Sequence, residues 1–310
     1  MKSHPNVTDL PRDYGRRFDL ASLVFLSPAG LLLFVLFLAP IGYAFYLGLT
    51  NLQLIGIHAT NFWFTGWFNL ISMMHDSEFY HSLWVTMLFV VGSGAFGATA
   101  AGLILAMLLQ AGISSLRVTV GALAMLSCIL PPVTVAVMWH ASTATGGVFP
   151  FLIGQPHGDL LYQHPMLIVS LANIWWLSGL SMLMFAAALK NVPVEMLEAA
   201  RLERASAFQR FNRITLPTLL PTIITSALLM CLLSFGNFTL IFLMTGGGPA
   251  YATNILPLYS YVVGFTYHRL GYGALLGDVI VVLSAVIGVV FVLAGYVSAR
   301  RATAVQKKGV

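Results

Sequence analysis

The sequence predicts an all-α membrane protein with six transmembrane helices, and three observations lead to that fold class. Only 8% of the 310 residues are charged, whereas a soluble globular domain carries about 25%. Hydrophobic residues make up 58% of the chain and the mean hydropathy is +0.87, which is more apolar surface than an aqueous domain of this size can bury. The apolar residues also form charge-free runs of about 20 residues, the length of helix that crosses a bilayer core of about 30 Å. This composition argues against a soluble enzyme.

Six apolar runs are long enough to cross the membrane. Two shorter stretches, residues 62–74 and 255–267, have about 13 residues each and suit re-entrant or interfacial segments on the outer side. The six expected spans are residues 21–49, 83–109, 116–139, 166–189, 219–245 and 275–296.

The cations indicate the orientation of these spans. Of the 15 Lys and Arg residues, all but Arg269 fall before the first span, between spans two and three, between spans four and five, or after the sixth. By the positive-inside rule, both termini are expected in the cytoplasm, which agrees with an even number of spans. The excess of Lys and Arg over Asp and Glu therefore reflects membrane topology, and we expect no nucleic-acid partner.

The same pattern divides the chain into a cytoplasmic leader (1–19), a transmembrane domain (20–299) and a cytoplasmic tail (300–310). The leader mixes acids and bases and the run after it is too long for the core of a signal peptide, so we expect no cleavage. Cys128 and Cys231 lie inside apolar runs, where they are expected to be buried hydrophobic residues and not a disulfide.

One polar segment on the cytoplasmic side, residues 190–217, concentrates charge: it holds five of the 15 cations and three of the ten acids. Asn191 is expected to cap a helix that has Pro193 in its first turn. Ser206 and Gln209 form a capping box for a second short helix, which we expect Pro217 to end. The 190–217 segment therefore predicts two short helices that meet at a bend.

The second of these helices carries an apolar face made of Phe208, Phe211 and Ile214. An apolar stripe on a short cytoplasmic helix suits the groove of another protein. The alternative is a loop that packs on its own membrane domain.

Within this segment, Glu198, Ala199 and Ala200, followed by Ala205, Phe208, Ile214, Leu216 and Pro217, resemble the EAA motif of permease subunits of bacterial ABC importers. At the position of the motif's glycine the chain has Arg204, preceded by Glu203, and we expect Arg204 to make the bend within ordinary φ/ψ limits. The resemblance implies that the segment docks in a cleft of an ATP-binding subunit. The residues implied in this coupling are Glu198, Ala199, Ala200, Glu203, Arg204, Ala205, Phe208, Phe211, Ile214 and Pro217.

A second resemblance covers most of the chain from the first span onward. The loop after the fifth span, with Gly246, Gly247, Gly248 and Pro249, followed by Thr253 and the run 271–274, is similar to sugar permeases of the maltose and glycerol-phosphate type, which have the MetI-like fold. This resemblance implies a bacterial inner-membrane protein in a heterodimer with a second permease, two ATP-binding subunits that hold ATP and Mg, and an extracytoplasmic sugar-binding protein. The loop 246–249 is expected to contact that binding protein.

The chain itself lacks the residues of an ATPase. Its lysines are Lys2, Lys190, Lys307 and Lys308, and none completes a phosphate-binding loop. No catalytic triad, carboxylate pair or metal-ligand spacing stands out, and most histidines fall in outer loops. We therefore expect a transport subunit that is not an enzyme and binds no cofactor or metal.

Uncharged polar and aromatic groups are the candidates for a substrate path. Asn173 and Trp176 on the fourth span, with Phe235 and Asn237 on the fifth, could offer hydrogen bonds and a stacking face to a sugar. An amide in hydrocarbon is costly unless it is paired or faces water, so a helix-to-helix packing contact is the alternative to the path for both amides. Trp175 and Trp176 cannot both line a path. No cation lies in mid-membrane, which favours a neutral sugar over a sugar phosphate.

Asp278 is an acid well inside the sixth span. It is expected to pair with Arg269 or to contact a sugar hydroxyl, and it also supports an alternative function, a proton-coupled secondary transporter. A membrane scaffold that transports nothing is a third possibility. Pro131 and Pro132 are expected to kink or end the third span, and Gly94, Ala98 and Gly102 form a row typical of close helix packing.

Overall fold

The computed structural model describes residues 20–110 and 114–308, and these are helical apart from turns, loops and one β-bridge between Thr50 and Phe64. The chain divides into two units, Met1–Tyr46 and Leu47–Val310. We describe each unit by itself.

In the first unit, α1 (Leu20–Leu33), a π-helical segment (Phe34–Leu38) and α2 (Ala39–Gly48) follow one another without a break. The apolar side chains from Val24 to Leu38 are exposed on every side of the helix. A helix that is apolar all round needs a lipid or protein environment. The apolar helix runs over Val24–Gly48, so the first predicted span is confirmed.

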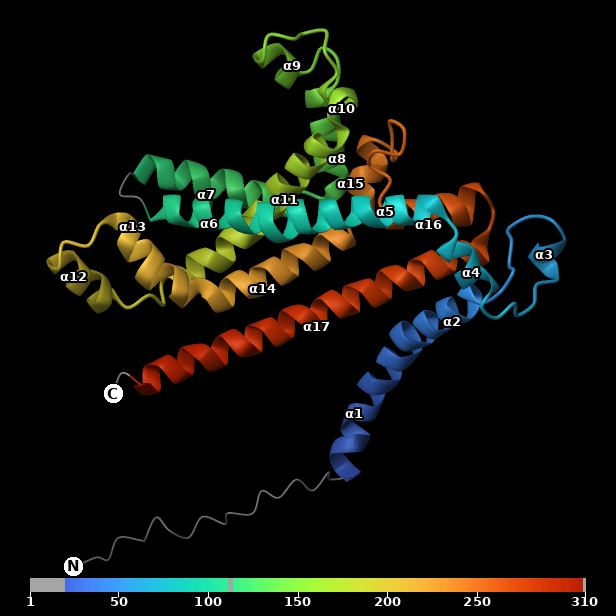
Figure 1. Ribbon diagram of the computed structural model, residues 1–310, viewed down its shortest axis with the longest axis horizontal. Helices are drawn as coiled ribbons and strands as arrows, with labels where there is room; N and C mark the ends of the chain where they lie inside the picture. Colours follow the sequence, from blue (N-terminus) through green and yellow to red (C-terminus); the bar gives the residue numbers. More distant parts are fainter. Residues whose placement is uncertain (1–19, 111–113, 309–310) are drawn as a thin grey trace, which may run out of the picture. The chain divides into compact units, whose positions relative to one another are not determined.

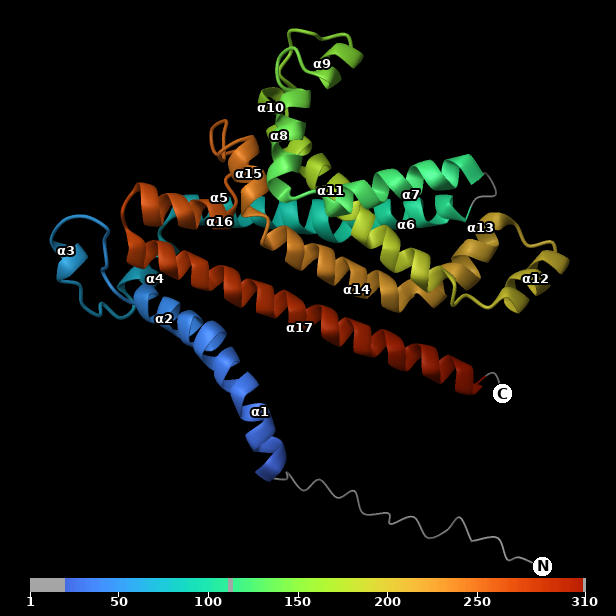
Figure 2. The same ribbon diagram turned by 180° about the vertical axis from the view of Figure 1, so that it is seen from behind.

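Long helices that lie alongside one another build the second unit (Figures 1 and 2). α5 (Ser77–Met87) continues through a π-helical segment (Leu88–Ala98) into α6 (Thr99–Leu109). α11 (Pro165–Leu189) packs on α6, and α14 (Leu216–Phe235) packs on the π-helical segment and on α17 (Leu270–Lys308). The helices Ser77–Leu109, Pro165–Leu189 and Leu270–Tyr296 confirm the second, fourth and sixth predicted spans.

The third predicted span, 116–139, is broken. α7 (Ser114–Ile129) ends before Pro131, and α8 (Pro132–Thr143) starts a new direction. The segments Arg117–Ile129 and Pro132–Leu152 are bent by 113°. Two successive prolines cannot continue a helical ladder, so the expected break at Pro131 and Pro132 is confirmed. The described residues thus contain five continuous spans, or six if this bent pair counts as one.

The fifth predicted span, 219–245, is wrong at both ends. The apolar helix begins earlier, at Ala207, and ends at Phe235. The helix ends at Gly236 and Asn237, and α15 (Phe238–Met244) is a separate helix that packs against α8. Glycine and asparagine favour helix ends, and a turn here redirects the last seven residues of the run.

Short helices fill the two stretches expected to be re-entrant or interfacial. They are α4 (Phe68–Met74) in the first, and α16 (Leu256–Tyr261) with a π-helical segment (Val262–Thr266) in the second. Three further short helices in the connections are α3 (Ile57–Thr60), α9 (Val148–Leu152) and α10 (Leu160–Gln163).

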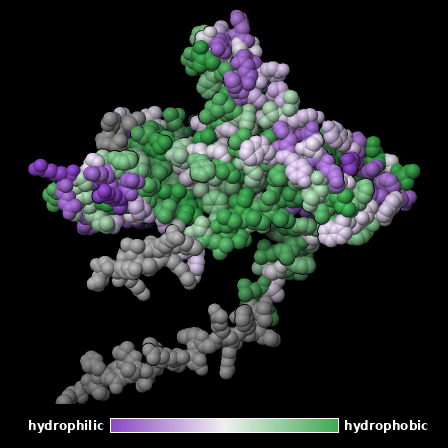
Figure 3. All heavy atoms as spheres, viewed as in Figure 1, coloured by the Kyte–Doolittle hydropathy of each residue, from purple (hydrophilic) through white to green (hydrophobic). Residues whose placement is uncertain are grey.

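Small residues let the long helices approach closely. A Cβ added at Gly94 would overlap Ser234, and one added at Gly102 would overlap Ser181, so this row of small residues serves helix packing. In the second unit, hydrophobic residues occupy the middle, while hydrophilic residues gather where α12 and α13 lie and near α9 (Figure 3).

Candidate functional site

The 190–217 segment forms two short helices joined by a bend. α12 (Val194–Leu202) starts after Pro193. Pro193 is therefore the N-cap, whereas the prediction placed it in the first turn of the helix. The second helix, α13 (Ala207–Arg210), begins at Ser206. The Ser206 hydroxyl accepts the N–H of Gln209 at 3.2 Å, and the Gln209 side chain accepts the N–H of Ser206 at 2.8 Å. The predicted capping box is confirmed.

The bend between these helices is a Schellman motif that places Arg204 in a left-handed conformation. The N–H of Ala205 donates to the Ala200 carbonyl at 2.9 Å, and that of Arg204 to the Arg201 carbonyl at 3.0 Å. Arg204 has φ of 58°, so the expectation that it bends within ordinary limits is wrong. Glycine enters this region without steric cost, which explains why the resembled motif has glycine at this position.

Pro217 does not end the second helix, contrary to the prediction. The helix passes through a π-helical segment (Phe211–Thr215) and continues as α14 to Phe235. A proline inside a helix lacks one N–H and crowds the carbonyl four residues earlier. The wider π turn just before Pro217 accommodates the proline, and α13 therefore continues into the span as one helix from Ala207 to Phe235.

The surface of the 190–217 segment carries exposed apolar side chains. Leu202 is 86% exposed and Phe208 74%, on either side of the Arg204 bend. Phe211 and Ile214 are half-buried, and Ile214 packs on a cluster with Leu189. The predicted apolar face is therefore divided: its first member faces outward and its last packs on the chain's own helices.

The remaining residues implied in coupling differ in exposure. Glu198, Ala199, Glu203 and Arg204 are exposed, as is Pro217, whereas Ala200 and Ala205 are half-buried. Arg210 donates to the carbonyl of Ala205 at 2.7 Å, which fixes the first turn of the second helix against the bend.

Asn173 and Asn237 join three helices in a buried polar network. Asn237 Nδ2 donates to Asn173 Oδ1 at 3.0 Å, and Asn173 Nδ2 donates to the hydroxyls of Ser93 and Ser234, both at 2.8 Å. All four side chains are buried. Asn237 lies at the break between α14 and α15, so the network ties that break to α11. Of the two roles that the sequence allowed for Asn173 and Asn237, these hydrogen bonds match the helix-to-helix packing contact.

Trp176 ties the other broken span to the same helix. Its Nε1 donates to the Leu130 carbonyl at 3.0 Å, one of the groups freed where α7 ends before Pro131. Trp175, also half-buried, lies 6.4 Å from Trp139, measured between ring centroids. One hydrophobic cluster contains Phe235 and has Trp176 packed against it. Asp278 is not part of that cluster.

Asp278 is buried and its Oδ2 atom has no hydrogen-bond partner among the described residues. A Cβ added at Gly48 would lie 2.6 Å from this oxygen. The expected pairing with Arg269 is not formed, because the Arg269 guanidinium lies over the ring of Tyr272, 4.9 Å from its centroid.

A second carboxylate, Asp76, joins three helices at the end of the second unit opposite α12. The hydroxyls of Tyr259 and Tyr272 both donate to its Oδ2 at 2.5 Å, and its Oδ1 accepts the N–H of Glu78 at 3.0 Å. Burial acts to raise the pKa of Asp76, but these donors hold that pKa below its usual value. This cluster cannot be found from the sequence pattern, because its members lie up to 196 residues apart.

The glycine-rich loop 246–249 has a defined shape. Gly246 and Gly247 have positive φ of 58° and 92°. Two histidines bind the carbonyls on either side of the loop: His140 Nδ1 donates to Met244 at 3.0 Å, and His81 Nε2 donates to Tyr251 at 3.1 Å. Both contacts join residues more than 100 positions apart in the chain, so the sequence does not reveal them.

No group of three or more His, Cys, Asp or Glu side chains within residues 20–110 and 114–308 is placed to hold a metal ion.

Comparison with solved structures shows the fold. The chain is similar to a chain of the bacterial alginate ABC transporter, which was solved in complex with a periplasmic protein bound to an alginate pentasaccharide. The TM-score is 0.70 at 21% identity, over 92% of this chain and 96% of that one. A solved amino acid ABC transporter matches with a TM-score of 0.51 at 13% identity, over 73% of this chain and 97% of that one.

Relatives in sequence cover nearly the whole chain. A probable ABC transporter permease of Bacillus subtilis is 30% identical over 88% of this chain and 89% of its own. The sulfoquinovosyl glycerol transport system permease SmoG of Agrobacterium fabrum is 29% identical, over 90% and 91%. The trehalose/maltose transport system permease MalF of Thermococcus litoralis is 28% identical, over 74% and 78%. Residues 123–305 match the family described as binding-protein-dependent transport system inner membrane component, and the chain belongs to this family of multi-pass ABC transporter permeases.

Proposed function

We propose that the chain is the transmembrane subunit of an ATP-driven importer and forms half of the path for a neutral saccharide. The observation that carries this proposal is the 190–217 segment, whose two helices present exposed Leu202 and Phe208 on either side of a fixed bend. Exposed apolar side chains of this size on a helix pair suit a groove in another protein. That protein is an ATP-binding subunit, and it holds the ATP and Mg.

The rigid connection supports a coupling role. The helix from Ala207 to Phe235 is continuous. A displacement of Phe208 is therefore transmitted along this helix to the break at Asn237. Closure of two ATP-binding subunits would move α14 and, through the Asn173–Asn237 contact, α11.

The family and the relatives support the other proposed partners. A second permease subunit would complete the path in a heterodimer, and an extracytoplasmic sugar-binding protein would contact the loop 246–249. Two relatives are named for saccharide substrates, which supports the sugar class. Both termini and the 190–217 segment lie in the cytoplasm in this arrangement, as the distribution of Lys and Arg indicates.

A neutral sugar is favoured over an anionic one by the spans themselves. The described spans carry no Lys or Arg in their middle, and an anion in mid-membrane needs a cationic partner. Membership of the ABC permease family argues against the alternative, a proton-coupled transporter that relies on Asp278. A substrate of the glycerol-phosphate type would need a cation from the second permease.

A pull-down experiment tests the docking proposal. The tagged chain is isolated from its native membrane, and the ATP-binding subunit that comes with it is quantified. The double variant Leu202→Ala and Phe208→Ala is expected to retain about a tenth of that subunit or less. The matched control, Phe151→Ala and Leu152→Ala on α9, removes side chains that are 72% and 70% exposed and should retain all of it. Equal retention by both variants would refute the docking role.

A further inference from the structure

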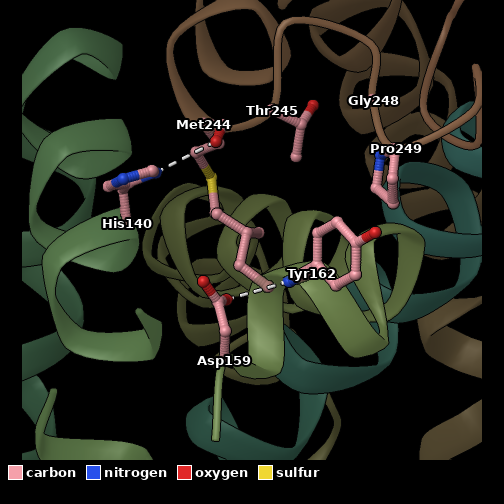
Figure 4. Close-up of a pocket in the computed structure, with 8 residues that line it drawn as sticks. His140, Asp159, Tyr162, Met244, Thr245, Gly248 and Pro249 are labelled. Atoms are coloured by element: carbon pink, nitrogen blue, oxygen red, sulfur yellow. Dashed lines mark hydrogen bonds between the residues drawn. The ribbon is translucent and has the colours of Figure 1, made fainter. Parts of the chain in front are cut away.

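A cavity of about 310 Å³ lies between α8, α10 and α15, on the side of the second unit away from α12 and α13. We call it the His140–Asp159 cavity after two of its lining residues. Figure 4 shows His140, Asp159, Tyr162 and Thr245 around it, with Pro249 on its rim. The volume falls in the range of about 300–1,000 Å³ that is common for small-molecule sites.

The polar side chains of this cavity are held in place by the chain itself. Asp159 caps α10 and accepts the N–H of Tyr162 at 2.9 Å. His140 donates to the carbonyl of Met244 at 3.0 Å, and the Thr245 hydroxyl lies 2.6 Å from that of Thr253. A site whose groups are already ordered loses little conformational entropy when a ligand binds.

Three hydrogen-bonding groups remain available in the cavity. The second oxygen of the Asp159 carboxylate, the hydroxyl of Tyr162 and Nε2 of His140 make no hydrogen bond to any other described residue. The Tyr162 side chain is 68% exposed, while Leu161 and Met244 beside it are buried. The cavity therefore combines an open aromatic ring, acceptors for hydroxyl groups and an apolar base.

The charge of the cavity selects among ligands. Of the described residues that line it, Asp159 is negative and none is Lys or Arg, so an anion is repelled. A carboxylate accepts hydroxyl groups in strong, charge-assisted bonds. An aromatic ring offers a flat apolar face that matches the C–H face of a pyranose. This set of groups fits an uncharged ring with several hydroxyl groups.

We propose that the His140–Asp159 cavity is a binding subsite for a neutral pyranose, occupied before the sugar reaches the span breaks at Pro131 and Asn237. The inference rests on the proposed saccharide import and adds a defined place where the sugar first contacts this chain. The loop 246–249 forms one wall through Gly248 and Pro249, so contact of that loop with a binding protein would bring the sugar to the cavity.

Saturation-transfer-difference NMR on the full chain in lipid nanodiscs tests the subsite. The probes are maltose, trehalose and galacturonate, each alone. We expect saturation transfer to at least one of the two neutral sugars and none to galacturonate at neutral pH. Tyr162→Ala should lower the signal by about tenfold because it removes the stacking face. Asp159→Asn keeps a capping residue but removes the charge. It should lower the signal of the neutral sugar and allow galacturonate to bind.

Phe151→Ala is the matched control, since this exposed aromatic lies on α9 and does not line the cavity; it should leave every signal unchanged. The subsite is refuted if neither neutral sugar gives a signal, if galacturonate binds as well as they do, or if Tyr162→Ala matches the wild-type chain. Such a result leaves the docking of the ATP-binding subunit intact, because the pull-down of the Leu202 and Phe208 variant measures that separately.

Discussion

Asn237 Nδ2 donates a hydrogen bond to Asn173 Oδ1 at 3.0 Å, and this contact ties the break in one apolar segment to the middle of a continuous helix. Three residues further along the same helix, Trp176 binds the carbonyl of Leu130 at the other break. Adjacent turns of α11 therefore hold both places where the chain leaves the direction of its span. The outer segments α8 and α15, which pack together, are fixed to the bundle through these two bonds.

Asn173→Ala should destabilise the protein by about 1–3 kcal/mol, because it leaves the Asn237 amide and the Ser234 hydroxyl buried without their partner. Trp176→Phe should cost about 1 kcal/mol, since it removes one donor and keeps most of the ring. Thermal unfolding of the purified chain in nanodiscs measures both. Ser27→Ala, at an exposed position of α1, is the control. An unchanged unfolding temperature for Asn173→Ala would contradict the proposed role of the network.

Arg204→Gly should stabilise the 190–217 segment by about 1 kcal/mol, because Arg204 has positive φ and glycine lacks the Cβ that makes this conformation costly. Arg204→Ala removes the charge but keeps the Cβ, so it should give no such gain. Hydrogen exchange of the Ala205 amide, which donates to Ala200, reports on this bend. Faster exchange in the glycine variant than in the alanine variant would show that the Schellman motif does not limit the segment.

Acid should remove the stabilisation that Asp76 provides. Its pKa is lowered in the folded protein, so the stabilisation is complete above the unfolded value of about 3.9 and is lost as the pH falls through the folded value. The unfolding temperature of the wild-type chain should exceed that of Asp76→Asn by a constant amount between about pH 5 and 7, and the difference should shrink below about pH 4. Tyr259→Phe removes one donor and should move that decline to higher pH. A difference that grows on acidification would be incompatible with the assignment.

Asp278→Asn should leave ATP-driven uptake intact and should not lower the unfolding temperature, because the carboxylate is buried with Oδ2 unpaired and an unpaired buried charge is costly. Uptake by reconstituted proteoliposomes, with and without a pH gradient, measures the first effect. Abolished uptake in the variant, or uptake by the wild-type chain driven by the pH gradient alone, would contradict this prediction and support a proton-coupled transporter.

The sequence predicted the features that depend on local pattern. Apolar runs located five continuous spans, Pro131 located the break in the third, and Ser206 with Gln209 located a helix start. The break at Gly236 and Asn237 was missed because the apolar run continues past both residues, and the Asn173 side chain that binds Asn237 lies 64 residues away in the sequence. The continuation past Pro217 was missed because the π turn that accommodates the proline leaves no mark in residue type.

Functional groups brought together by tertiary structure were beyond the reach of the sequence. His140 and Asp159 meet Thr245 and Pro249 only because α8 and α15 both leave their spans and pack on each other. The φ of Arg204 was also missed, since the residue type argued for an ordinary bend while the surrounding hydrogen bonds impose a left-handed one. In both cases the backbone arrangement decided what the residue type alone left open.

ATP-driven sugar uptake by the reconstituted transporter tests the central claim, that the 190–217 segment couples this permease to an ATPase. The complex is assembled with the Leu202→Ala and Phe208→Ala chain or with the Phe151→Ala and Leu152→Ala control, and uptake into proteoliposomes is measured at equal amounts of each permease. The account predicts that uptake falls by about tenfold or more in the first complex and is unchanged in the second. Full uptake by the first complex would contradict it.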